Sequence, residues 1–234
     1  MRPLRVALAL SLALWTCLGL AQVQTPLHVE AFGGEQQRLP PIKVPTELTE
    51  FIPKGFVLRA AIQTKMWHEG ETLFLYDNDA ETFPEVHLHA LRRNGKELNL
   101  YDGTLADIAG LLPLQLRKGK QAVAFAYHVG FDEADTTFIV FTADADSYRA
   151  IFERKTTSGQ MRVLRMAPLT FQIWSADWKL DRGDSCVWCP HRYRIQTYLL
   201  RDNNFELIRR SVTSAALSPD EIAGKPFVIS KAGN

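Results

Sequence analysis

Short runs of apolar residues separated by polar turns occupy most of the chain from residue 56 onward. Between residues 85 and 101, valine, leucine and alanine alternate with polar residues on either side of Asn94-Gly95. Such alternation is typical of strands with one buried face, and Asn-Gly is a strong two-residue hairpin signal. The pattern therefore predicts an antiparallel, all-β protein.

Three octamers share one pattern: a threonine, an apolar residue, an aromatic residue at the fifth place and an aspartate at the eighth. They are Thr72–Asp79 (TLFLYDND), Thr137–Asp144 (TFIVFTAD) and Thr170–Asp177 (TFQIWSAD). Each is followed by a strand–turn–strand pattern, and the first two are preceded by a further strand. We therefore expect four-stranded meander units, each of propeller-blade size, at 56–102, 121–166 and 168–213.

Three such units do not close a propeller ring. A β-sandwich or barrel is therefore the alternative architecture for a single domain over 46–234, with a C-terminal extension at 214–234. A few short helices are also expected, at 46–52, 104–111 and 218–223, because Thr46, Thr104 and Ser218 can cap a first turn.

The first 21 residues have the pattern of a signal peptide. Arg2 and Arg5 precede an apolar run that ends at Leu20, and Gly19 and Ala21 are small residues at the spacing of a cleavage site. Residues 22–45, rich in proline, glycine and glutamine, are expected to form an extended leader or linker. We expect a secreted or periplasmic bacterial protein with no membrane span after cleavage.

Charge restricts the possible partners. The chain has 27 basic and 26 acidic residues, so loss of two arginines with the signal peptide leaves 25 against 26, or −1. A nucleic-acid partner requires a basic face, which this balance does not favour. An extracytoplasmic protein or a carbohydrate is the expected partner.

The stretch from Asp77 to Leu88, DNDAETFPEVHL, resembles the D-x-D-G-D-G-x-x-E-hydrophobic signature of FG-GAP/VCBS-type repeats. The resemblance implies a secreted, propeller-type repeat protein with Ca²⁺ in a loop between strands. The candidate calcium ligands that it implies are Asp77, Asp79, Glu81 and Glu85. The glycines of the signature are missing and Ala80 stands where the tight turn needs one, so weak calcium binding or none is expected.

Cys186 and Cys189 are the only cysteines left after cleavage, since Cys17 lies in the signal peptide. In an oxidising compartment an even number of cysteines favours a disulfide. Pro190 directly after the second cysteine argues against haem attachment. A zinc site that includes His191 and a redox-active pair remain alternatives.

Two further sets of residues are candidates for recognition. His87 and His89 point to the same face of a strand and can hold a metal ion, but the alternation favours a solvated strand face. Trp178 and Trp188 lie in predicted loops and, with His191, are candidate ligand-binding residues.

The chain contains no nucleophile elbow, phosphate-binding loop, dinucleotide fingerprint or zinc-protease motif. The expected function is therefore a non-enzymatic extracytoplasmic binding or structural module with an unknown ligand. The alternative is an enzyme with a site built from loops, either a metal-dependent hydrolase or a thiol redox protein using Cys186 and Cys189.

Overall fold

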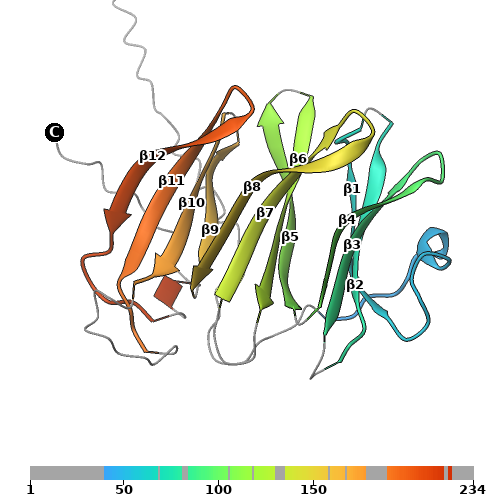
Figure 1. Cartoon of the computed structure of the whole chain (residues 1–234), viewed down its shortest axis with the longest axis horizontal. Coiled ribbons are helices and arrows are strands. Elements are labelled where there is room, and N and C mark those ends of the chain that lie inside the picture. The colour runs from blue at the N-terminus through green and yellow to red at the C-terminus, as the bar shows by residue number, and fades with distance from the viewer. Residues whose placement is uncertain are drawn as a thin grey trace, which may run out of the picture.

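Three antiparallel, four-stranded meander sheets make up the protein (Figure 1). The structure is a computed structural model that describes residues 40–67, 69–80, 84–104, 106–117, 119–129, 135–157, 159–166, 168–177, 189–218 and 221–222. Within these ranges the chain forms twelve strands. The predicted all-β class and the four-stranded meander are confirmed. The predicted signal peptide lies outside the described residues.

The sheets follow one another along the chain. The N-terminal sheet contains β1 (Val57–Thr64), β2 (Glu71–Asp77), β3 (Glu85–Arg92) and β4 (Glu97–Thr104). The middle sheet contains β5 (Ala106–Arg117), β6 (Lys120–Val129), β7 (Asp135–Asp144) and β8 (Ser147–Thr157). The C-terminal sheet contains β9 (Gln160–Met166), β10 (Leu169–Ala176), β11 (Tyr193–Arg201) and β12 (Asn204–Val212). Strands β1, β5 and β9 line one edge of the stack, and β4, β8 and β12 line the other (Figure 1).

The predicted unit boundaries need correction. The second sheet begins at Ala106, inside the segment 104–111 that was expected to be helical, and β9 belongs to the third sheet. The first and third octamers form second strands, β2 and β10, whereas the second octamer forms β7, a third strand. Pro113 suggests the end of a helix, but β5 is an edge strand, where the missing N–H of a proline is tolerated.

The other expected helices are short. The segment 46–52 contains a single 3₁₀ turn, η1 (Thr46–Leu48). At the C-terminal end, Ser218 and Glu221 exchange hydrogen bonds between their side chains and backbone N–H groups, which is a capping box at the start of a helical turn. Of the predicted helix 218–223, only Glu221 and Ile222 are described as helical.

The middle sheet is buried on both faces. On β7, Phe138 and Val140 pack toward the C-terminal sheet, whereas Ile139 and Phe141 pack toward the N-terminal sheet. A strand covered on both faces is apolar at consecutive positions rather than alternate ones. This explains the unbroken run of apolar residues in the second octamer.

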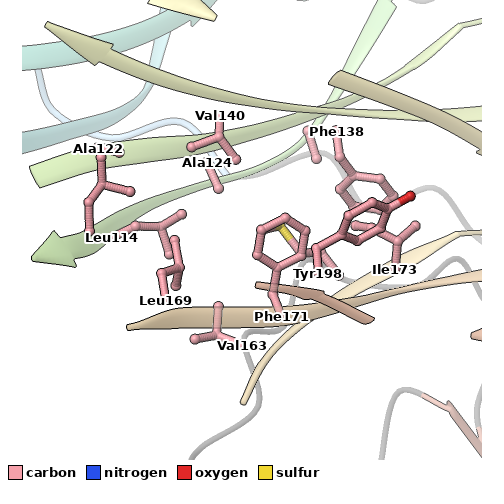
Figure 2. Packing of buried hydrophobic residues seen from close by; sticks show 13 residues of the cluster. Leu114, Ala122, Ala124, Phe138, Val140, Val163, Leu169, Phe171, Ile173 and Tyr198 are labelled. Atoms are coloured by element: carbon pink, nitrogen blue, oxygen red, sulfur yellow. The ribbon is translucent and has the colours of Figure 1, made fainter. Parts of the chain in front are cut away.

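Aliphatic and aromatic side chains fill the interface between the middle and C-terminal sheets (Figure 2). Phe171 of β10 is fully buried and contacts both Phe152 of β8 and Phe205 of β12, with ring centroids 4.9 and 5.0 Å away. Tyr198 of β11 stacks on the same ring at 5.5 Å. These contacts join strands from both sheets into one core.

Segments near the two ends of the described chain cover the outer faces of the stack. The segment before β1 packs on the N-terminal sheet, and its Ile42 N–H donates to the Leu58 carbonyl oxygen at 2.8 Å. The segment after β12 packs on the C-terminal sheet, where Leu217 and Ile222 lie against Trp174 and Tyr193. The three sheets therefore form an open stack with covered ends, and not a ring.

Both edge strands of every sheet contain a β-bulge, whereas the two central strands of each sheet pair without interruption. The unpaired residues are Arg59, Leu100, Ala109, Leu116, Ile151, Leu164 and Ile208, two of them on β5. Bulges disfavour pairing of exposed edges with other chains and redirect the side chains that follow them. The side chains redirected by bulges form parts of two candidate sites.

Replacing the central ring of the aromatic interface is expected to destabilise the whole stack. Phe171→Ala removes a fully buried side chain, so the free energy of unfolding should fall by about 3–5 kcal/mol. Ile208→Ala is the control, because that side chain is 49% exposed and should change stability by less than about 0.5 kcal/mol. Urea unfolding measures both values, and equal effects of the two variants would contradict the described core.

Candidate functional site

The acidic loop after β2 surrounds a buried arginine. Arg59 donates through Nε and Nη2 to both carboxylate oxygens of Asp77, each at 3.0 Å, and Nη2 also contacts Asp79. The side chains of Arg59 and Asp77 are 3% and 4% exposed. Burial lowers the pKa of Arg59, but hydrogen bonds to Asp77 and then Asp79 outweigh it and raise the pKa above its ordinary value. The pair is therefore a buried ion pair.

The same loop makes a tight turn without glycine. Asp79 adopts a φ of 54°, and the Asn78 side-chain oxygen accepts hydrogen bonds from the Ala80 and Glu85 N–H groups at 3.1 Å. Aspartate tolerates this left-handed conformation better than most residues. Asp79 thus forms the tight turn for which the FG-GAP/VCBS-type signature has a glycine at position 80.

The calcium set of Asp77, Asp79, Glu81 and Glu85 stays a prediction, because Glu81 lies outside the described residues. In the described part of the loop, the positive charge facing Asp77 and Asp79 is the Arg59 guanidinium. Glu85 begins β3, and its side chain points toward His87 rather than toward Asp77, with Glu85 Oε2 lying 3.9 Å from His87 Nε2.

The residues predicted around the cysteine loop are only partly described. Trp178, Cys186 and Trp188 lie outside the described residues, so the disulfide and the recognition role of the tryptophans stay predictions. Cys189 is half-buried. His191 is fully buried, and its backbone pairs with Leu217 through hydrogen bonds of 2.9 and 2.8 Å. A side chain with no exposed surface does not line an open recognition surface.

His87 and His89 do not lie on a freely solvated strand face, as the alternation suggested. Their side chains are 22% and 14% exposed on the outer face of the N-terminal sheet, beside the segment that precedes β1. Asp102 of β4 accepts at one oxygen, Oδ1, from both rings, 2.6 Å from His87 Nδ1 and 3.0 Å from His89 Nε2. The other nitrogen of His89 lies 2.6 Å from Glu97 Oε1.

Electrostatics favour the charged form of this aspartate. Burial raises the pKa of Asp102, but hydrogen bonds to His89 and His87 outweigh burial and lower the pKa below its ordinary value. Asn99 donates from its side-chain amide to the second oxygen, Oδ2. The carboxylate is therefore held in one orientation by three neighbours.

A β-bulge brings Asp102 to the histidines. From the Asn94-Gly95 turn, regular pairing would place Tyr101 opposite His87. Leu100 is the unpaired residue of the bulge, so the register shifts by one and Asp102 pairs with His87. Asp102 was not predicted, because nothing in the sequence pattern marks the bulge.

A second site is a basic cleft of about 610 Å³ at the interface of the middle and C-terminal sheets. At one end of this interface, inward-facing positions change from apolar to polar: Phe152 is followed by Arg154 on β8, and Ile173 by Ser175 on β10. The residues that line the cleft are Arg154, Lys155, Thr156, Ser175, Ala176, Asp177, Arg194, Ile195, Gln196, Arg210, Ser211 and Val212.

Basic side chains dominate this lining, with four of them against one carboxylate. Asp177 is 4% exposed and accepts from Arg194 Nε, and Lys155 pairs with Asp135 at 2.7 Å. Arg154 and Arg210 have no carboxylate within ion-pair distance among the described residues. The cleft therefore carries excess positive charge that can attract an anion.

Bulges also shape the basic cleft. The unpaired Ile208 shifts the register of β12 so that Arg210 lies opposite Gln196 and shares its inward face. The unpaired Ile151 likewise places Arg154 opposite Phe138. Neither arginine was predicted as a site residue. In hairpins without the bulges, the residue before each arginine would lie on the inward face in its place.

Comparison with known proteins found no matching protein-family model, no matching curated protein and no matching solved structure. The repeated meander sheets agree with a repeat-type β-protein, and no family is identified. Among the described residues, no helix has the length and apolar character needed to cross a bilayer.

The buried ion pair is expected to be far more sensitive to substitution than an exposed one. Arg59→Met leaves Asp77 buried without its partner, so unfolding free energy should fall by about 3–5 kcal/mol. Arg149→Met is the matched control, since Arg149 and Asp144 are both more than half exposed and such pairs contribute about 0–1 kcal/mol. Chemical denaturation compares the two, and a loss below 1 kcal/mol for Arg59→Met would show that the pair is not buried as described.

Proposed function

We propose that the protein is a non-enzymatic, extracytoplasmic binding module that holds an anionic, hydroxyl-bearing ligand in the basic cleft. The observation that carries this proposal is the change from apolar to polar residues at inward-facing positions of β8, β10, β11 and β12. The arginines at these positions are exposed, so their charged groups reach solvent at the mouth of the cleft. Several basic side chains gathered around one cavity favour recognition of an anion over a structural role.

The charge of the cleft favours an anion. Asp177 is paired with Arg194, which leaves Arg154 and Arg210 as positive groups without a carboxylate partner in the described part of the chain. A guanidinium presents a planar fork of donors that matches carboxylate, sulfate and phosphate groups. Two such groups in one cleft suit a ligand with at least one acidic function.

The remaining polar groups favour a ligand that also carries hydroxyls. Thr156, Ser175 and Gln196 contribute two hydroxyl groups and an amide to the lining. A cleft of about 610 Å³ is within the range of small-ligand sites. An acidic oligosaccharide meets both requirements, and a carbohydrate is one of the two partner classes expected from the sequence.

The other expectations from the sequence are part of this proposal. Export through a signal peptide over residues 1–21 would place the module in the periplasm or outside the cell, where a Cys186–Cys189 disulfide is stable. The resemblance of the Asp77 loop to FG-GAP/VCBS-type repeats supports a secreted repeat protein. It gives weaker support for calcium, because Arg59 already pairs with two of the candidate ligands.

An enzymatic function is the second candidate. One observation favours it, namely the cluster of His87, His89 and Asp102, because two imidazoles and a carboxylate can hold a catalytic metal ion. Thiol redox chemistry at the cysteine pair is the other form of this candidate. Metal analysis of the purified protein together with a free-thiol titration distinguishes both from the binding module.

Anion binding is tested by calorimetric titration of the mature chain with trigalacturonate, using neutral maltotriose as the uncharged comparison. We expect saturable binding of the acidic sugar alone, weakened as salt is added because the charges are screened. Arg154→Gln and Arg210→Gln should each weaken it about tenfold or more, since a charge-assisted hydrogen bond contributes about 1.5–3 kcal/mol.

Arg209→Gln is the matched control for these variants. Arg209 of β12 pairs with Thr197 of β11 and does not line the cleft, so its loss changes the net charge equally without removing a cleft donor. An affinity that falls as much for Arg209→Gln as for Arg210→Gln would contradict the cleft as the binding site. Equal binding of maltotriose would contradict an anionic ligand.

A further inference from the structure

We propose that His87, His89 and Asp102 form a binding site for a divalent first-row transition-metal ion, for which Zn²⁺ is the test ion. One ligand atom from each of these residues lies within 4.8 Å of the others. The site is on the outer face of the N-terminal sheet, whereas the basic cleft lies between the other two sheets. The inference therefore does not depend on the proposed anion ligand.

The Asp102 oxygen already lies at nearly the required separation from one nitrogen of each histidine. Asp102 Oδ1 is 2.6 Å from His87 Nδ1 and 3.0 Å from His89 Nε2. In a tetrahedral zinc site with metal–ligand bonds of about 2.0–2.1 Å, neighbouring ligand atoms are about 3.3 Å apart. Replacing the shared protons by a metal ion thus requires these contacts to lengthen by less than 1 Å.

Two of the three ligands, His89 and Asp102, have the hydrogen-bond partners that metal sites use to orient their ligands. A ligating histidine usually donates its second ring N–H to a carboxylate or carbonyl group. His89 Nδ1 lies 2.6 Å from Glu97 Oε1, which meets this requirement when Nε2 is the ligand. Asn99 donates to Asp102 Oδ2 and leaves Oδ1 for the metal.

Aromatic rings hold the two imidazoles in place. Tyr76 stacks on His87 with ring centroids 4.9 Å apart and an interplanar angle of 14°, and Phe56 meets the same imidazole edge-on at 5.4 Å. Tyr76 and Phe74 meet His89 edge-on at 5.3 and 5.7 Å. Burial, followed by the charges of Glu97 and Asp102, raises the pKa of Tyr76 to about 12, so its hydroxyl stays protonated.

The donor set determines the class of ion. Two imidazole nitrogens and one carboxylate oxygen suit Zn²⁺, Fe²⁺, Ni²⁺ or Cu²⁺, whereas Ca²⁺ and Mg²⁺ prefer oxygen ligands alone. Three protein ligands leave a fourth position, and the 47% exposure of the Asp102 side chain places that position within reach of solvent.

The experiment is a titration of the mature chain, purified without a histidine tag, with Zn²⁺ and with Co²⁺ as the spectroscopic probe. We expect one ion per chain, visible Co²⁺ absorption of a nitrogen- and oxygen-ligated site, and perturbed ring resonances of His87 and His89 in NMR spectra. At a hundredfold excess over Kd, Zn²⁺ should raise the melting temperature by about 5 °C or more.

The variants separate the ligands from the groups that orient them. Asp102→Asn and His89→Gln keep similar side-chain volumes and should weaken Zn²⁺ binding more than Glu97→Gln, for which a loss of about 10–100-fold is expected. Asp144→Asn is the matched control, since this exposed aspartate at the β7–β8 turn lies outside the cluster. It should leave Zn²⁺ affinity unchanged.

Three results would overturn the proposal. The first is the absence of Zn²⁺ or Co²⁺ uptake by the wild-type chain. The second is Zn²⁺ uptake that survives Asp102→Asn and leaves the resonances of both histidines unmoved. The third is equal affinity for Ca²⁺ or Mg²⁺. The NMR measurement uses the wild-type chain, so the test holds even where a variant fails to fold.

Discussion

Burial of both faces of the middle sheet is the constraint on which the rest of the structure depends. The central strands β6 and β7 send alternate side chains to the N-terminal and C-terminal sheets, and neither outer sheet has another large apolar surface to cover its inner face. Sheets that pack face to face bury a layer about 10 Å thick and exclude water from it. The outer faces, covered by segments near the ends of the described chain, contribute two smaller clusters. The stability of each sheet is thereby coupled to that of the middle one.

The bulges in the edge strands explain how a stack of similar sheets acquires different sites. Each fourth strand contains one unpaired residue, at Leu100, Ile151 and Ile208, and the residues beyond it exchange faces. In the N-terminal sheet this exchange brings a carboxylate to two histidines. At the interface of the other two sheets it directs arginines inward. The core, held by uninterrupted central strands, tolerates these polar residues because they lie where the apolar packing ends.

Much of the architecture could be predicted from the sequence, because alternation and turn residues are local signals. The β3–β4 hairpin follows from Asn94-Gly95, and the four-stranded meander from the spacing of the apolar runs. Unit boundaries were wrong because the second octamer forms a third strand, and because Pro113 is compatible with an edge strand as well as with a helix end. Asp102 beside the two predicted histidines and the arginines of the basic cleft were missed for a different reason. Their composition depends on register shifts at bulged residues such as Leu100, which have ordinary apolar side chains and no sequence signature.

Hydrogen–deuterium exchange of the backbone amides, followed by NMR or mass spectrometry, tests the central role of the middle sheet most directly. Amides of β6 and β7 should exchange most slowly, through global unfolding alone, because both faces of these strands are buried and their mutual pairing is uninterrupted. Amides of the edge strands β1, β4, β9 and β12 should exchange faster through local opening. Equal protection in all three sheets with independent unfolding of each, or faster exchange in β6 and β7 than in the outer sheets, would contradict this account.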